Sequence, residues 1–300
     1  MIRVAAAQYP ISRPSGFPDW KQHTQKWVAD ASGHGADLLL FPEYGAMELV
    51  GILDEATRND LRAQVLAMNA LKDEFCETFA RLSAQYGVII VAPSLPVIHN
   101  DKAVNRVYVF SPGGATGYQD KHFMTRFEDE EWKVSGGENI LSVFETSWGC
   151  FGIQICYDVE FPLASALLAG AGAGLILAPS CTETIRGATR VHVGARARAL
   201  ENQLYTAVAQ TTGNADWSPA VDVNYGYAAI YSTPDRGLPE EGILASGTPQ
   251  ATGWIYGDLD MKLLAAVRQD GQVFNFRDSQ RVMEKLKERG PEIRKILLDS

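Results

Sequence analysis

Three segments of the sequence place a reactive side chain directly after an apolar run with strand character. Glu43 follows LLLFP, Lys121 follows GYQD, and Cys156 follows GIQI. A cysteine thiolate is a strong nucleophile, a carboxylate can take up its proton, and an ammonium can stabilise a developing negative charge. Because site residues of α/β folds commonly lie where strands end, these three positions are candidates for a catalytic site.

Each of these residues also has an ordinary structural interpretation. Glu43 can be a solvated loop carboxylate or a charge at a helix N-terminus, and Lys121 can be a surface lysine. Cys156 can be a buried core cysteine, although the turn that follows it and its polar neighbours Tyr157 and Asp158 count against this. No single segment decides between the two interpretations.

The elements that must position these residues alternate between strand-like and helix-like segments. This alternation predicts an α/β fold with both faces of its sheet covered, in one domain over residues 1–300. A Pro/Gly-rich stretch over 233–253 is expected to be a surface excursion. Expected strands are 2–7, 37–41, 88–92, 106–110, 142–144, 152–155, 175–178, 205–210, 228–231 and 253–258. Expected helices are 19–33, 69–86, 162–170, 191–202 and an amphipathic C-terminal tail at about 281–298, interrupted by Gly290 and Pro291.

Together the three segments resemble the nitrilase (carbon–nitrogen hydrolase) superfamily, which carries a Glu–Lys–Cys triad in this order. Glu43 in FPEY, Lys121 in DKH and Cys156 in ICYD match its three motifs. Supporting matches are VAAAQ near the N-terminus, APSCT and ARALEN, and the resemblance extends to about Asp258, over most of the chain. It implies a four-layer α-β-β-α sandwich.

The resemblance also implies how the residues divide the chemistry. Glu43 acts as general base toward the Cys156 thiol, and the Lys121 ammonium with the backbone N–H of Tyr157 stabilises the oxyanion. A second glutamate a few positions after the lysine holds the substrate nitrogen or positions Lys121, and Glu128 fits this place best. No metal or organic cofactor is required.

Several neighbouring residues are assigned less directly. Glu130 and Glu131 compete with Glu128 for the place of the second glutamate. Cys181 and Thr182 lie in APSCT, which resembles the substrate loop of the family, so we expect them to contact substrate.

One position departs from the family pattern. Relatives commonly have arginine where CYDVEFP has Glu160, so a positive charge near the site is replaced by a negative one. Glu160 is either an outward carboxylate at a helix start or a residue that favours a substrate with a cationic or neutral head group.

The branch of the superfamily follows from what surrounds the cysteine. Family members that hydrolyse nitriles typically have Trp-Glu after it, whereas Tyr157-Asp158 resembles the amidase and carbamoylase branches. A membrane branch needs transmembrane helices, which the sequence does not predict. A synthetase branch needs an added ATP domain, for which 300 residues leave no room. We therefore expect a hydrolase of a small amide, ω-amide or N-carbamoyl amine that works through a thioester.

Three alternatives stay open at this point. The first is a nitrilase acting on small nitriles. The second is a non-catalytic family scaffold, which an intact Glu43, Lys121 and Cys156 disfavours. The third is a redox-responsive thiol protein using Cys150, Cys156 and Cys181, although the chain has no CxxC pair.

Composition narrows the partners and the compartment. A net charge of -9 disfavours nucleic acids and anionic membranes, and no apolar run approaches the roughly 20 residues of a membrane span. Four cysteines without zinc-type spacing, in a chain with no signal-peptide pattern, suggest a cytoplasmic protein with free thiols. The resemblance further implies a homodimer or a higher even homo-oligomer, formed through helices that include the C-terminal one.

Overall fold

The computed structural model describes residues 1–290 and 292–298. Its sheet divides at strand β1 (Ile2–Pro10). The first part of β1 pairs antiparallel with β14 (Gly253–Leu259) and in parallel with β2 (Leu38–Leu40). Its last residues pair instead in parallel with β10 (Tyr205–Asn214). The two halves of the sheet therefore separate on either side of this crossing.

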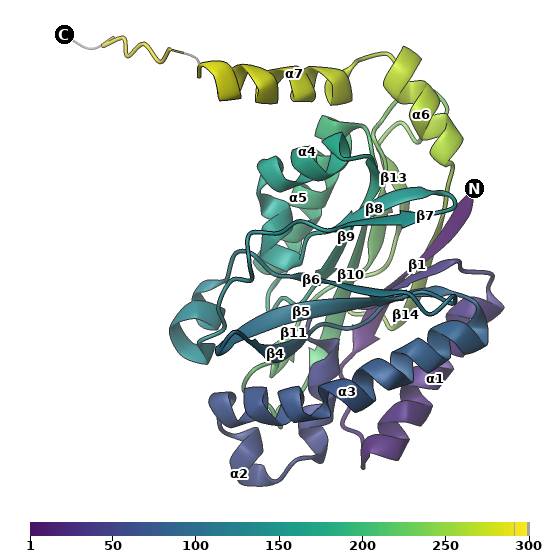
Figure 1. Ribbon diagram of the computed structural model, residues 1–300, viewed down its shortest axis with the longest axis vertical. Helices are drawn as coiled ribbons and strands as arrows, with labels where there is room; N and C mark the ends of the chain where they lie inside the picture. Colours follow the sequence, from purple (N-terminus) through teal and green to yellow (C-terminus); the bar gives the residue numbers. More distant parts are fainter. Residues whose placement is uncertain (291, 299–300) are drawn as a thin grey trace.

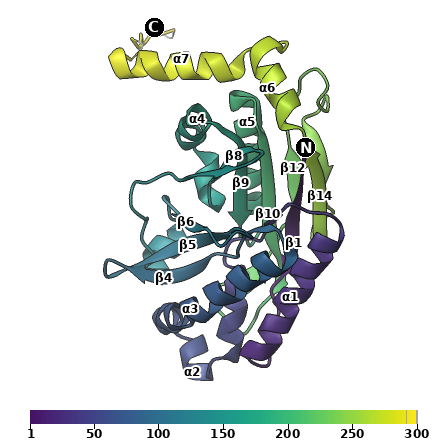
Figure 2. The ribbon, with the colours of Figure 1, turned by 45° about the vertical axis from the view of Figure 1, so that its right-hand side comes forward.

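Within the described residues, fourteen strands join through these pairings in the order β4-β5-β3-β2-β1-β10-β9-β8-β7, with the other strands attached to this path. Helices α1 and α3 cover the half with β2 to β6, and helices α4 and α5 cover the half with β7 to β10, as Figures 1 and 2 show. The strands thus form two central layers with helices outside, which confirms the α-β-β-α arrangement.

The remaining elements have the following bounds. The other strands are β3 (Ile89–Val91), β4 (Leu95–His99), β5 (Lys102–Phe110), β6 (Thr116–Asp120), β7 (Val143–Thr146), β8 (Gly149–Ile153), β9 (Ala173–Ser180), β11 (Val223–Asn224), β12 (Ala229–Tyr231) and β13 (Ile243–Ser246). The α-helices are α1 (Phe17–Gly33), α2 (Glu55–Arg58), α3 (Leu61–Tyr86), α4 (Pro162–Gly170), α5 (Ile185–Asn202), α6 (Met261–Asp270) and α7 (Asn275–Glu288). Short helical turns of other types are η1 (Gly45–Ile52), η2 (Glu128–Trp132) and η3 (Cys156–Glu160).

Local sequence explains the elements that frame the site. Every residue of β9 is buried, as expected for a parallel strand covered on both faces. Helix α3 begins where the Asp60 side chain accepts hydrogen bonds from the N–H groups of Arg62 and Ala63, and it ends at Gly87, whose φ of 69° favours glycine. Because α3 ends at Gly87, strand β3 begins directly after it at Ile89.

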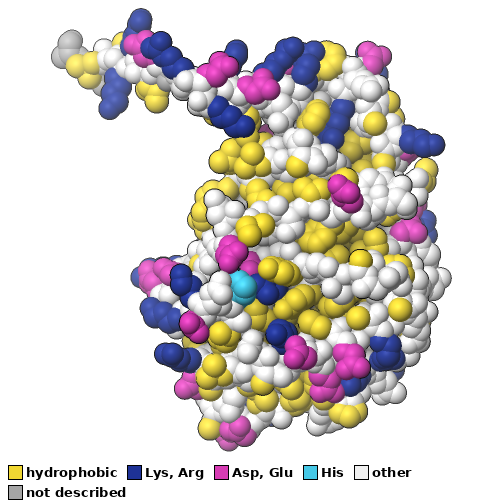
Figure 3. Space-filling model, viewed as in Figure 1, with side chains coloured by type: hydrophobic (Ala, Val, Ile, Leu, Met, Phe, Trp, Pro, Cys, Tyr) yellow, Lys and Arg dark blue, Asp and Glu magenta, His cyan; other side chains and the backbone are white. Residues whose placement is uncertain are grey.

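The C-terminal expectation was wrong in its bounds. Helix α7 starts before residue 281 and ends at Glu288, and residues 292–298 are not helical. Gly290 weakens a helix and a proline disfavours helical backbone in the residue before it, although Pro291 itself lies outside the described residues. In Figure 1 α7 runs across the top of the molecule above α4, which it contacts, and Figure 3 shows apolar side chains on the surface below it.

Two further differences concern the C-terminal third. The expected excursion over 233–253 contains β13, which pairs with β12, and the helix α6 follows β14 where no helix was expected. Among the described residues, no helix has both the length and the apolar character needed to cross a membrane.

Candidate active site

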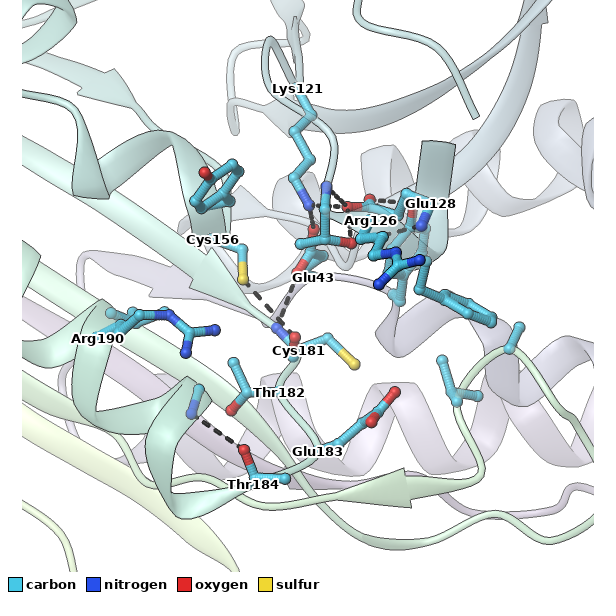
Figure 4. A pocket seen from close by; sticks show the side chains of 18 of the residues that line it. Glu43, Lys121, Arg126, Glu128, Cys156, Cys181, Thr182, Glu183, Thr184 and Arg190 are labelled. Carbon is cyan, nitrogen blue, oxygen red and sulfur yellow. Dashed lines mark hydrogen bonds and ion pairs between the residues drawn. The ribbon is translucent and has the colours of Figure 1, made fainter. Parts of the chain in front are cut away.

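Four chain segments that follow strands β2, β6, β8 and β9 meet at a cavity of about 330 Å³. Glu43, Lys121, Cys156 and Cys181 lie on these segments and line the cavity, as Figure 4 shows. The figure also shows the Cys156 sulfur and the Glu43 carboxylate facing the same space. The structure therefore brings together the three side chains that the sequence identified from separate motifs.

Glu43 is held from several sides in a buried position. The chain leaves β2 through Pro42, and Tyr44 turns it with a left-handed φ of 54°, its N–H donating to Ser94 Oγ. One oxygen of Glu43, Oε1, accepts from Lys121 Nζ at 2.8 Å. The other oxygen, Oε2, accepts from the backbone N–H of Cys181 at 2.9 Å. The carboxylate is thus fixed in orientation.

Lys121 lies between two carboxylates. Its Nζ is 2.8 Å from Glu43 Oε1 and 2.6 Å from Glu128 Oε2, and its side chain is only 1% exposed. Because Lys121 directly follows β6, its backbone N–H still pairs with the carbonyl of Asn105 on β5. The ammonium is therefore positioned by the sheet at one end and by two carboxylates at the other.

The structure distinguishes Glu128 from its competitors. Glu128 is buried, and its Oε2 also accepts from the N–H and the hydroxyl of Thr125, while Tyr44 donates its hydroxyl to Oε1. Glu130 and Glu131 are exposed, and Glu130 pairs with Arg126 at the surface. Among the three, Glu128 alone contacts Lys121.

Cys156 lies at the turn between β8 and the short helix η3. Its φ of 50° is uncommon for a residue with a side chain, and such backbone strain tends to concentrate at functional sites. The side chain is 4% exposed, and its Sγ lies 3.7 Å from the carbonyl oxygen of Cys181. The turn presents the thiol to the cavity while the strand before it stays in the core.

The segment after β9 closes the site with its backbone. Cys181 donates its N–H to Glu43, but its own thiol points to Asn224 Oδ1 at 3.3 Å. The Thr182 hydroxyl donates to the carbonyl of Tyr225 at 2.6 Å. Both residues line the cavity, and Cys181 contacts Glu43 through its backbone N–H and not through its side chain.

Tyr157 and Glu160 also line the cavity, on the helix η3 that begins at Cys156. Oε1 of Glu160 lies 3.4 Å from Nε of Arg190, a residue of α5. Where relatives commonly have an arginine, this chain has Glu160. The negative charge of Glu160 is balanced by Arg190, an arginine from a distant segment.

Two residues to which the sequence analysis gave no role in the site hold it together. The Asn105 amide donates to Glu43 Oε1 at 2.9 Å from a fully buried position on β5. Asp158 accepts from the N–H groups of His122 and Phe123, and so links the segment after Lys121 to the turn of Cys156. A polar signal existed for Asn105, since an asparagine is unusual within a buried strand.

Burial and neighbouring charges set the protonation of the site. Burial raises the pKa of Glu43 to about 7, although the Lys121 ammonium opposes this shift and Glu128 adds to it. Burial also raises the pKa of Cys156 well above its usual range, with Glu43 acting in the same direction and Lys121 against it. The resting thiol is therefore protonated at neutral pH and needs a base.

Lys121 and Glu128 form the charged partners of this base. Burial lowers the pKa of Lys121, but Glu43 and Glu128 outweigh burial and raise it well above its ordinary value. For Glu128, burial opposes ionisation, yet Lys121 and Thr125 bring its pKa below its ordinary value. At neutral pH the site thus holds an ammonium, a carboxylate and a second carboxyl group that titrates.

The described residues contain no group of three or more His, Cys, Asp or Glu side chains arranged to hold a metal ion. The cavity holds a thiol with a carboxyl group and an ammonium beside it.

Comparison with known proteins places the chain among carbon–nitrogen hydrolases. A sequence model described as carbon-nitrogen hydrolase matches residues 3–269. The probable hydrolase YhcX of Bacillus subtilis is 31% identical over 280 residues, which cover 93% of this chain and 54% of that protein, so the chain spans about half of its length. The omega-amidase NIT2 of Danio rerio is 26% identical over 278 residues, covering 89% of this chain and 91% of that protein.

A solved structure shows the same fold. The amidase from Nesterenkonia sp. AN1 superposes with a TM-score of 0.67 over 90% of this chain and 97% of that chain, at 22% sequence identity.

Proposed function

Since the chain belongs to the carbon–nitrogen hydrolase family, we propose that it hydrolyses the C–N bond of a small amide through a thioester on Cys156. The observation that carries this proposal is the meeting of a thiol, a titrating carboxyl and an ammonium, from three distant segments, in one cavity. The relative NIT2 is named an omega-amidase, and the structure of the Nesterenkonia amidase is described with an acrylamide adduct at its active-site cysteine. Both descriptions support a cysteine-dependent amide hydrolase.

The first half of the reaction forms the thioester. The Glu43 carboxylate takes the proton of the Cys156 thiol while the sulfur attacks the amide carbon, and the carbonyl electrons move to oxygen. The Lys121 ammonium and the N–H of Tyr157 stabilise this oxyanion. When the carbonyl re-forms, the C–N bond breaks, and Glu43 returns its proton to the leaving ammonia or amine.

The second half releases the acid. Glu43, again a carboxylate, takes a proton from a water molecule whose oxygen attacks the thioester carbon. The tetrahedral intermediate uses the same two donors, and its collapse breaks the C–S bond. The thiolate of Cys156 recovers its proton from Glu43. Throughout, Glu128 holds Lys121 in place through their 2.6 Å contact.

The substrate is an amide, an ω-amide or an N-carbamoyl amine. A cavity of about 330 Å³ suits a small molecule and not a folded protein. The order Tyr157-Asp158 after the cysteine favours amides over nitriles.

An ammonia-release screen tests this function. The panel contains short aliphatic amides, ω-amides, N-carbamoyl amino acids and the matching nitriles. We expect release from amide-type compounds, none from Cys156→Ala, and an acyl adduct on Cys156 by mass spectrometry. Release from nitriles alone, or release that persists in Cys156→Ala at the wild-type rate, contradicts the proposal.

We also propose that two copies, or a higher even number, associate through the face formed by α4 and α7. Leu163 on α4 is 58% exposed, and Leu286 on α7 is 54% exposed, beside a groove between these two helices. Sedimentation velocity at micromolar concentration is expected to show a dimer that Leu163→Asp weakens and Leu66→Asp, on the distant α3, leaves intact. A monomer in the wild type argues against this assembly.

We propose that the protein is cytoplasmic because its cysteine thiols are free. Cys76, Cys150, Cys156 and Cys181 are free in the structure, which suits the reducing cytoplasm. Fractionation of the native host, with detection by antibody, is expected to place the protein with cytoplasmic markers.

A further inference from the structure

The wall of the cavity beside Cys156 carries an ion pair that takes no part in the proposed bond cleavage. Glu160 lies four residues after Cys156 on η3, and Arg190 reaches toward it from α5. Both line the cavity, and Figure 4 shows the Arg190 guanidinium projecting into it. The pair is therefore placed to contact the part of the substrate that is not cleaved.

The contact between the two residues leaves binding capacity on both. Only Nε of Arg190 meets Glu160, at 3.4 Å, and among the described residues none accepts a hydrogen bond from its Nη atoms. The Glu160 side chain is 21% exposed and that of Arg190 is 62% exposed. A guanidinium in this state can still bind a carboxylate through two parallel hydrogen bonds, and the carboxylate can still accept from an ammonium.

We infer that this pair recognises a zwitterionic head group, so that the substrate is the ω-amide of an α-amino acid. The inference rests on the proposed amide hydrolysis. An α-amino acid carries its ammonium and its carboxylate on one carbon, so its two charges lie side by side, as those of Glu160 and Arg190 do at 3.4 Å. Laid against the pair in the opposite order, each substrate charge meets its complement on the protein.

Other head groups fit the pair less well. A head group with only a carboxylate gains Arg190 but meets the negative charge of Glu160 beside it, and an ammonium alone has the reverse problem. A neutral head group removes water from both charges and returns no ionic contact. The pair thus discriminates by repulsion as well as attraction.

A series of four amides of equal reach separates these cases. Glutamine has both charges, the monoamide of glutaric acid has only the carboxylate, 4-aminobutanamide has only the ammonium, and butanamide has neither. We expect the wild type to hydrolyse glutamine with the highest kcat/KM of the four.

Charge-removing variants assign the two contacts. For glutamine, Glu160→Gln and Arg190→Gln should each raise KM by about tenfold, the effect of losing a hydrogen bond to a charged group. The glutaric monoamide should be weakened only by Arg190→Gln, and 4-aminobutanamide only by Glu160→Gln. Butanamide, which makes no ionic contact with either residue, should be weakened by neither variant. The matched control is Arg186→Gln, an exposed arginine on the same helix that does not line the cavity.

Binding to Cys156→Ala separates this inference from the proposed reaction. Calorimetry with glutamine needs no turnover, and its affinity should fall when Glu160→Gln or Arg190→Gln is added. The proposed reaction fails if the wild type releases ammonia from no amide-type compound of the screening panel, whereas the calorimetry still decides the head-group contact. The inference is overturned if glutamine binds no better than butanamide. It is also overturned if Glu183→Gln, a second acidic residue of the cavity, weakens glutamine while Glu160→Gln does not.

Discussion

The Nζ atom of Lys121 lies 2.8 Å from Oε1 of Glu43, although 78 residues separate the two in the chain. Glu128 approaches the same ammonium from the other side, and all three side chains are almost fully buried. Removing one partner from a buried set of charges is costly because the remaining charges lose their compensation without regaining water. The electrostatic balance of the site therefore depends on Lys121.

Replacing Lys121 by methionine should both inactivate and destabilise the protein. Two carboxyl groups then face each other in the core, and we expect a loss of about 3–5 kcal/mol in the free energy of unfolding at slightly alkaline pH. The loss should shrink as the pH falls, because protonated carboxyls no longer repel each other. Urea unfolding at several pH values measures both effects.

A lysine at the surface provides the control for this variant. Lys21 Nζ lies 2.7 Å from Glu74 Oε1, but both side chains are substantially exposed. Lys21→Met should cost less than about 1 kcal/mol. Equal losses in the two variants would show that burial does not make the Lys121 contacts important.

The pH dependence of catalysis should follow Glu43. Its pKa is raised from 4.5 to about 7, and only the ionised form can accept the thiol proton. We therefore expect kcat/KM to be low at acid pH and to increase as the pH rises through about 7. The same shift acts in reverse on stability: because folding raises this pKa, Glu43 favours the folded state most below pH 4.5, and this contribution declines as the pH rises toward 7.

Steady-state rates on the best amide between about pH 5 and 9 measure this profile. A rate that is flat between pH 5 and 8 would mean that Glu43 is already ionised throughout and would remove the role of burial. Unfolding measured over the same range in Glu43→Gln should lack the decline assigned to Glu43.

Asn105 should act on the reaction through Glu43. Its amide donates to Glu43 Oε1, and this hydrogen bond favours the ionised carboxylate. In Asn105→Ala the pKa of Glu43 should rise further, so the acid limb of kcat/KM moves to higher pH and the rate at neutral pH falls by about tenfold.

The exposed Asn214, at the end of β10, is a matched control because it lies outside the cavity. Asn214→Ala should leave the profile in place. A lower rate in Asn105→Ala without any displacement of the acid limb would indicate only a packing role.

The sequence could predict the residues that local patterns identify, and could not predict those placed by three-dimensional register. Glu43, Lys121 and Cys156 each follow a strand in a recognisable motif, and the strand ends bring them to one place. The spacing favours Glu128 over Glu130 and Glu131, and of these three only Glu128 is buried beside Lys121.

Other parts of the molecule depend on contacts between distant segments. Arg190 resembles any exposed arginine on a helix until α5 is placed beside η3, so no periodicity could single it out. Helix α7 packs against α4 and α5, which lie far earlier in the chain, and it ends at Glu288, two residues before Gly290. The branching of the sheet at β1 follows from pairing partners that lie more than 200 residues apart.

Asp158 should affect the rate through the position of the thiol. Its carboxylate accepts from the N–H of Phe123 at 2.8 Å and of His122 at 3.1 Å, which ties the segment after Lys121 to the turn that presents Cys156. Asp158→Asn keeps the shape of the side chain but removes its negative charge and one of its two accepting oxygens. We therefore expect a loss of about 1–3 kcal/mol in the free energy of unfolding. Because the ammonium and the thiol then lose their fixed separation, kcat should fall by about tenfold or more while KM changes little.

Asp129→Asn, which replaces an exposed aspartate in η2, is the control and should leave both kcat and stability unchanged. If Asp158→Asn unfolds earlier but retains the wild-type kcat at low temperature, the link between the two segments serves stability alone.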